Sequence, residues 1–180
     1  MLPLFTLLDD IYGVLFLPQT TLTALRDRSV AFAGALIIVG VNILEALRQG
    51  IDTLLTTILA SLVTWFLFSY LLERLGHALG KEVNLNRLLG LTGFSSLPWI
   101  FFAPALNLGG SLGTILALAV VAWFLTWQVW AVAIALEAQV VRVITLIPLA
   151  FAGSLVSITI LIKSFSTLSE IGNLLHLPQV

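Results

Sequence analysis

Long stretches without any charged residue are the feature that most constrains how this chain folds. These runs cover residues 29–44, 53–72, 88–136 and 143–162. A helix needs about 20 apolar residues to cross the hydrocarbon of a bilayer. The run of 49 residues is therefore too long for one span and fits a hairpin of two. Together the runs predict five transmembrane helices, at roughly 29–48, 52–74, 86–105, 112–137 and 143–163.

The composition also indicates that the chain lies in a lipid bilayer. Only 9% of the 180 residues are charged, whereas a soluble domain carries about 25%. The ten-residue alternation of a membrane β-barrel is absent from the sequence. We therefore expect an all-α fold, a polytopic membrane helical bundle. One transmembrane domain (29–163) follows an interfacial segment (1–28) and precedes a short C-terminal tail (164–180).

The N-terminal segment predicts a helix with one narrow polar side, formed by Thr6, Asp9, Asp10 and Gly13. It lacks the basic start of a signal peptide and places acidic residues inside the would-be apolar core. We interpret it as an amphipathic helix lying at the membrane interface. Pro18 is expected to end this helix, and residues 19–28 to form a second short helix leading into the first span.

Basic residues predict the orientation. With five spans, one side of the membrane carries six basic residues: Arg26, Arg28, Arg74, Lys81, Arg87 and Arg142. The other side carries only Arg48 and Lys163. Because basic loops stay inside, we expect a cytoplasmic N-terminus and a C-terminus outside or in a lumen.

The stretch GFSSLPWIFFAP (93–104) places helix breakers inside the third predicted span. Pro98 removes a backbone donor and clashes with the preceding turn, so we expect a kink or break near Leu97. Ser95, Ser96 or an adjacent helix would then have to satisfy the freed carbonyls. Small residues allow close helix contact here: Gly90 and Gly93 in this span, and Ala31, Gly34 and Ala35 in the first. The break is either a structural kink or, with Trp99 beside it, the lining of a binding cavity.

The fourth predicted span carries a tryptophan ridge, formed by Trp123, Trp127 and Trp130 at spacings of four and three. One interpretation is a packing ridge whose indole N–H groups donate to a neighbouring helix. The alternative is a stacking surface for a lipid, quinone or pigment. His77 and His176 lie in polar or terminal segments, so neither predicts a haem or chlorophyll ligand.

Glu137 lies on the same face as the ridge and is the foremost charged residue near the core. A structural ion pair with Arg74, Arg87 or Arg142 is one interpretation, because carboxylates in spans are usually paired. Proton transfer is the other, but no chain of further carboxylates links Glu137 to Glu45 near the opposite side.

Three segments carry a family resemblance. DIYGVLFLPQTTLTAL (10–25), with Tyr12 and Gly13, resembles the entry to the Yip-type membrane domain. LLGLTGFSSLPWIFFAPALNL (88–108) and WQVWAVAIALEAQ (127–139) resemble its third and fourth spans. The resemblance implies a five-span membrane protein similar to the short prokaryotic branch. Eukaryotic members are associated with Rab GTPases and vesicle traffic through a long N-terminal region. Only about 28 residues precede the first span here, so the resemblance does not carry Rab binding over to this chain.

Two classes of function remain. The chain has no HExxH, P-loop, GxGxxG or GxSxG pattern, and the adjacent Asp9 and Asp10 make a poor metal site. We therefore expect no enzyme activity, cofactor, metal or nucleic-acid partner. The first class is a membrane organiser that binds lipid, other membrane proteins or itself. The alternative is an accessory subunit of a larger complex, or a small-molecule carrier that uses the Pro98 kink and the tryptophan ridge.

Overall fold

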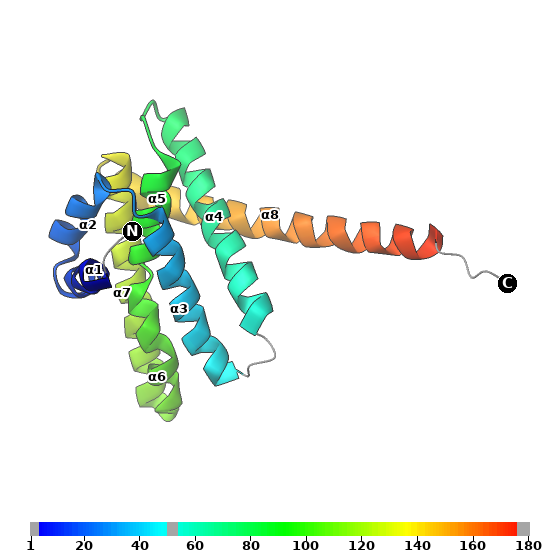
Figure 1. Ribbon diagram of the computed structural model, residues 1–180, viewed down its shortest axis with the longest axis horizontal. Helices are drawn as coiled ribbons and strands as arrows, with labels where there is room; N and C mark the ends of the chain where they lie inside the picture. Colours follow the sequence, from blue (N-terminus) through cyan, green and yellow to red (C-terminus); the bar gives the residue numbers. More distant parts are fainter. Residues whose placement is uncertain (1–3, 50–53, 176–180) are drawn as a thin grey trace.

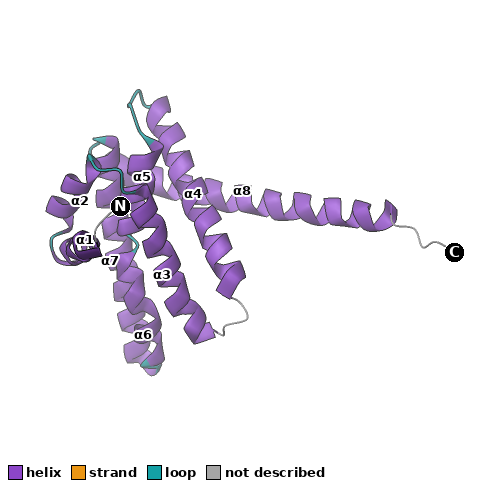
Figure 2. Ribbon diagram, in the orientation of Figure 1, coloured by secondary structure: helices purple, strands orange, loops and turns teal. Residues whose placement is uncertain are grey.

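The computed structural model describes the backbone of residues 4–49 and 54–175, and the side chains of residues 5–46, 54–160 and 163. Every regular element in these residues is a helix (Figure 2). The elements are α1 (Leu4–Phe16), α2 (Pro18–Arg26), α3 (Ala31–Gln49), α4 (Leu54–Ala78), α5 (Leu85–Phe94), the 3₁₀ helix η2 (Leu97–Phe101), α6 (Phe102–Asn107), α7 (Gly110–Leu136) and α8 (Val140–Leu175). Residues 1–3 of the predicted interfacial segment, 52–53 of the second predicted span and 176–180 of the predicted tail lie outside the described part.

Four helical segments are long and apolar enough to cross a membrane. They are Leu54–Ala78, Leu85–Asn107, Gly110–Leu136 and Val140–Ile160. α3 contains a shorter apolar stretch, Ala31–Ala46. Many large apolar side chains on these helices are exposed, as expected for a surface in contact with lipid. The predicted all-helical fold is confirmed, and the four segments indicate a multi-pass membrane protein.

The helices form a bundle with one crosswise member. Figure 1 shows α3, α4 and α7 running in similar directions, with α5 and α6 following one another along the bundle. α1 and α2 lie on one side of the bundle. α8 runs crosswise to α3, α4 and α7 and leaves the bundle on the other side. The fifth predicted span (143–163) thus lies in a longer helix, which passes through Pro148 without ending.

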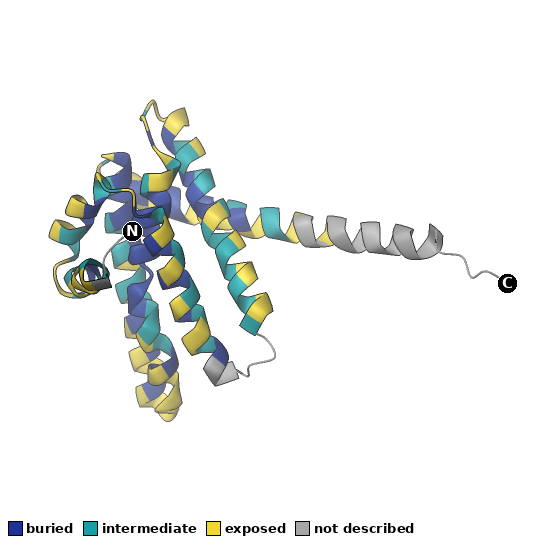
Figure 3. Cartoon of the chain, viewed as in Figure 1, coloured by how far each residue is buried: buried dark blue, intermediate teal, exposed yellow. Residues whose placement is uncertain are grey.

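α5 and the start of η2 form the centre of this bundle, because residues 88–98 are all buried, whereas α6 lies at one end of the bundle and is largely exposed. Figure 3 shows the buried residues gathered here. Glycines permit the close packing: a Cβ on Gly34 would lie 2.8 Å from the carbonyl oxygen of Leu89. A Cβ on Gly93 would lie 2.7 Å from the carbonyl carbon of Gly34. The close approach predicted for Gly93 is confirmed, and its partner is α3.

α1 ends at Phe16 and α2 begins at Pro18, with Leu17 between them. The position of α1 at the membrane interface stays a prediction. The polar side of α1 is partly turned inward, because Asp10 is 9% exposed. Both carboxylate oxygens of Asp10 accept hydrogen bonds from Arg28, at 2.9 Å each. Gly13 faces α2, since a Cβ there would meet the side chain of Thr21.

Candidate functional site

The helix break lies where Pro98 requires it. α5 ends at Phe94, residues 95 and 96 form a turn, and η2 begins at Leu97. The backbone N–H of Ser96 bonds to the Gly93 carbonyl, three residues back. The Thr92 carbonyl, four residues before Ser96, thereby loses its usual helical donor. The expected break near Leu97 is confirmed.

Three side chains converge on that Thr92 carbonyl. Ser95 donates from its hydroxyl at 2.9 Å and Ser96 at 3.0 Å. Gln128 of α7 donates from Nε2 at 3.2 Å. Because all four residues are buried, this oxygen would otherwise be an unsatisfied acceptor in an apolar core. The expectation that the two serines or an adjacent helix would satisfy the break holds for both sources of donors.

The Thr92 hydroxyl extends this network to α4. It donates to the Leu88 carbonyl at 2.6 Å and accepts from the Trp65 indole Nε1 at 3.0 Å. The hydroxyls of Thr92 and Ser69 lie 3.0 Å apart and share a further hydrogen bond. The polar groups of three helices, α4, α5 and α7, therefore meet around one threonine. We name Trp65, Ser69, Thr92, Ser95, Ser96 and Gln128 the core polar network.

Two buried polar atoms of α7 have no partner within the part of the chain that the structure describes. They are Gln128 Oε1 and Trp123 Nε1. Buried polar groups are normally hydrogen-bonded, and an unpaired one costs about 1–3 kcal/mol. Gln128 also has its Nε2 atom 3.4 Å from the Ser96 hydroxyl. Gln128 Oε1 is therefore an acceptor of the core polar network that has no donor.

The tryptophan ridge faces other protein elements along much of its length. Trp127 donates from Nε1 to the Val14 carbonyl of α1 at 2.7 Å. Trp123 stacks on Phe101 of η2 with ring centroids 5.6 Å apart. Trp127 and Trp130 are 5.1 Å apart by the same measure. The ridge therefore holds α1 and η2 against α7, as the packing interpretation requires, except that the Trp123 indole N–H is unpaired.

Trp99 extends this aromatic packing on the far side of the break. Its ring stacks on Phe102 with centroids 4.5 Å apart. It also contacts the edge of Phe124 of α7, with centroids 5.2 Å apart. Pro98 itself is buried in η2. The break is thus enclosed by side chains and by α7.

Glu137 caps α7 at the end of the bundle where several basic residues gather. Its φ of 48° is left-handed, which is uncommon for a residue other than glycine. Its carboxylate accepts a hydrogen bond from Arg87 at 3.3 Å and lies 3.6 Å from Arg26. Lys81 donates to its backbone carbonyl at 3.1 Å. Of the three arginines considered from the sequence, Arg87 is a partner.

Arg26 was not recognised from the sequence as a partner of Glu137, and Arg74, which was a candidate, bonds to a different residue. Arg74 donates from Nε to the Tyr70 hydroxyl at 2.9 Å and lies over the same ring. Arg26 contacts both Asp27 and Glu137. The pKa of Arg26 is raised, first by its hydrogen bond with Asp27 and then by that carboxylate's charge. These contacts bind α2, α5 and α7 together at this end of the bundle, which we call the basic end after Arg26, Lys81 and Arg87.

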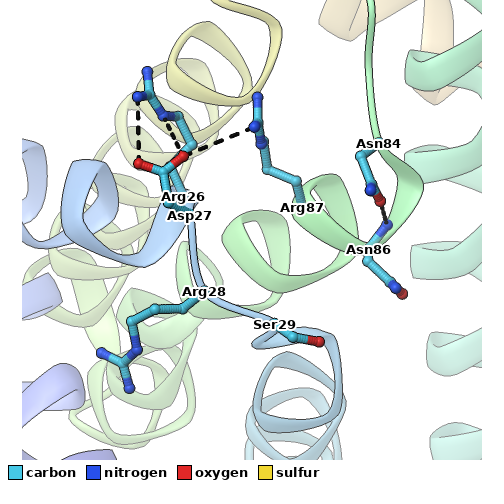
Figure 4. Close-up of a pocket in the computed structure, with 7 residues that line it drawn as sticks. All are labelled: Arg26, Asp27, Arg28, Ser29, Asn84, Asn86 and Arg87. Carbon is cyan, nitrogen blue, oxygen red and sulfur yellow. Dashed lines mark hydrogen bonds and ion pairs between the residues drawn. The ribbon is translucent and has the colours of Figure 1, made fainter.

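A polar pocket of about 300 Å³ opens beside these charges. Figure 4 shows its lining residues, Arg26, Asp27, Arg28, Ser29, Asn84, Asn86 and Arg87. Arg26 and Arg87 both point toward Asp27, whereas Arg28 points away toward α1 (Figure 4). Arg87 Nη2 lies 3.8 Å from the Asp27 carboxylate. Each arginine faces a carboxylate, so the pocket is a network of ion pairs that is open to water.

Two further site candidates lie in α1. Tyr12 is 63% exposed and contacts Phe16, with ring centroids 4.7 Å apart. Gly13 packs against Thr21 of α2. Within the described residues, no group of three or more His, Cys, Asp and Glu side chains is placed to hold a metal.

The predicted site residues therefore fall into three regions rather than one. Gly93 and Pro98 lie in the central break, next to the tryptophan ridge and Trp99. Glu137 lies at the basic end, and Tyr12 and Gly13 lie on α1. Comparisons with protein-family models, curated proteins and solved structures gave no significant match to this chain.

Proposed function

We propose that this chain is a non-enzymatic, multi-pass membrane protein that organises lipid or other membrane proteins in an assembly or trafficking role. The core polar network is the observation that supports this proposal. Three of its side chains donate to the carbonyl freed at the helix break, and two more bond to the Thr92 hydroxyl. The apolar outer surface is therefore the part left to meet partners. The resemblance of residues 10–25, 88–108 and 127–139 to Yip-type membrane domains agrees with such a role.

We further propose that α3, α4, the α5–α6 segment and α7 cross the bilayer. α3 has 19 residues, so it is about 28 Å long. That is close to the hydrocarbon thickness of about 30 Å. α3 packs between α4 and α5, in the close contact made at Gly34. A helix held in this way crosses with its neighbours, although its own apolar stretch is the shortest.

The direction of α8 changes the arrangement expected from the sequence. Five spans would place the C-terminus opposite the N-terminus. Because α8 runs crosswise to the other long helices (Figure 1), we propose that it lies along the membrane within one leaflet. The exposed side chains of Phe151, Leu155, Val156 and Ile160 favour hydrocarbon over water. The basic end, with Arg26, Lys81 and Arg87, then faces the cytoplasm, and Lys163 lies on the same side.

Single cysteines test this arrangement directly, because the natural chain contains none. Leu79 and Ser111 are exposed at opposite ends of the bundle, and Lys163 is exposed on α8. In vesicles or cells, we expect a membrane-impermeant thiol reagent to label Leu79→Cys and Lys163→Cys from the cytoplasmic side. Ser111→Cys is expected to react from the other side. Labelling of Lys163→Cys together with Ser111→Cys would restore the five-span arrangement and refute ours.

A small-molecule carrier is the second candidate, and the unpaired atoms Gln128 Oε1 and Trp123 Nε1 favour it. A polar solute that enters the break would find an acceptor and a donor there. Purified protein in sealed vesicles distinguishes the two roles. An organiser leaves solute flux at the level of empty vesicles. A carrier raises that flux, and Gln128→Leu should then remove the increase while Thr126→Val, an exposed change on the same helix, does not.

A further inference from the structure

The half of the bundle near the basic end carries helices that the opposite half lacks. α1 and α2 flank it on one side, and α8 leaves from it on the other (Figure 1). Building on the proposed membrane arrangement, we propose that α1, α2 and the first part of α8 insert into the cytoplasmic leaflet as a wedge. The partner of this surface is the acyl-chain layer of a bilayer whose cytoplasmic face is convex.

The depth of α1 follows from its contact with α7. Trp127 donates to the Val14 carbonyl of α1 at 2.7 Å. Trp127 lies ten residues before Glu137, which is about 15 Å along the helix axis. α2 returns from there to the basic end, where Arg26 lies 3.6 Å from Glu137. Because the hydrocarbon is about 30 Å thick, α1 lies within a single leaflet.

The surface chemistry of α1 matches that position. Its exposed large apolar side chains are Phe5, Leu8, Tyr12 and Phe16, with 52–79% of each residue accessible. Their spacing of three and four residues places them on one face of the helix, and the exposed Asp9 lies between this face and Gly13. Gly13, on a neighbouring face, contacts Thr21 of α2, and α2 leads to the basic end. α2 therefore covers the side of α1 toward the basic end, and the apolar face is left free for acyl chains.

α1 is fastened to the bundle by contacts that leave this apolar face free. Asp10 accepts two hydrogen bonds from Arg28, and its side chain is 11% exposed. Val14 and Leu22 are completely buried, in α1 and α2. A charged pair with both oxygens satisfied is tolerated at membrane depth far better than a lone carboxylate. α1 is thus held in the leaflet by the protein as well as by lipid.

α8 adds width at a similar level on the other side. Its Phe151 ring contacts Phe68 of α4, with centroids 6.4 Å apart. A Cβ on Gly153 would lie 3.0 Å from Leu71 Cδ1. Leu71 lies seven residues before the end of α4 at Ala78, about 10 Å along the axis. Added cross-section in one leaflet only favours curved membranes, which is why binding by such helices depends on curvature.

Spin labels on single cysteines measure the depth of α1. The labels are placed at Tyr12 and, as references, at Leu125 on α7 and Leu79 at the end of α4, all of them exposed. We expect the Tyr12 label to collide with oxygen and avoid an aqueous nickel chelate as the Leu125 label does. If the Tyr12 label meets the chelate as often as the Leu79 label, the wedge is refuted. If the Leu125 label also meets it, the membrane body proposed above fails instead.

Vesicle sorting measures the predicted preference for curvature. The full-length protein is reconstituted into small and large vesicles of the same phospholipid, and its density per lipid area is compared. We expect a higher density in the small vesicles, and Leu8→Lys with Tyr12→Lys should remove that difference. Leu8→Met with Tyr12→Phe keeps the apolar face and should retain it. Equal density of the unmodified protein in both vesicle sizes, or sorting that survives the lysines, would overturn the proposal.

Discussion

The crossing of α3 and α5 provides the sharpest test of the packing, because backbone meets backbone there. A Cβ on Gly93 would lie 2.7 Å from the carbonyl carbon of Gly34 and 2.8 Å from its oxygen. Backbone atoms cannot rotate away, so Gly93→Ala forces the two helices apart. Overpacking of this kind costs about 1–3 kcal/mol. Alanine recovers about 0.5–1 kcal/mol through its higher helix propensity, which leaves a net loss of up to about 2.5 kcal/mol.

Gly40→Ala is the matched control for Gly93→Ala. Gly40 lies in α3, six residues after Gly34, but a Cβ there would meet nothing within 4 Å. This change should therefore stabilise the protein by about 0.5–1 kcal/mol. Thermal unfolding in detergent compares the two, since 1 kcal/mol moves the melting temperature of a chain this size by about 2–4 °C. A Gly93→Ala protein that melts at or above Gly40→Ala would refute the close crossing.

Three further predictions concern hydrogen bonds and charges. Ser95→Ala should lower the free energy of unfolding by about 1 kcal/mol or less, because Ser96 and Gln128 still donate to the same carbonyl. In thermal unfolding, the triple variant Ser95→Ala, Ser96→Ala and Gln128→Leu should cost more than the sum of the three single changes. Glu137→Gly loses exposed ion pairs worth about 1 kcal/mol or less but relieves the left-handed backbone, so it should melt higher than Glu137→Ala. Asp10→Asn leaves Arg28 without a countercharge and should lower the melting temperature, whereas Asp9→Asn, at an exposed position, should not. Equal melting temperatures of the two variants would contradict the role given to the Asp10–Arg28 pair.

The helices and the break were predictable because their causes are local. Uncharged runs near 20 residues mark membrane segments whatever their neighbours are, and Pro98 disrupts a helix through its own ring. The serines that satisfy the break lie within four residues of the carbonyl they bond. Arg87 was one of three candidates for Glu137, because both residues were expected at the same end of the bundle.

Contacts between distant segments were not predictable from one sequence. Gln128 lies 36 residues from Thr92, and only the rotation of α7 against α5 decides that the two side chains meet. Arg26 reaches Glu137 because α2 folds back toward the basic end. For the same reason, the pairing of Asp10 with Arg28 was not predicted. The crosswise course of α8 depends on its packing against α4, which no periodicity within α8 encodes.

The central position of α5 also bears on how the chain is assembled during synthesis. Leu85–Asn107 is the least hydrophobic of the four apolar segments and the most buried, so lipid alone retains it least. α3 leaves the ribosome earlier and offers Gly34 as a docking surface when α5 arrives. Gln128 emerges only with α7. A nascent chain that ends before α7 therefore holds the Thr92 carbonyl with its two serines alone, and the segment becomes firmly inserted once α7 has joined it.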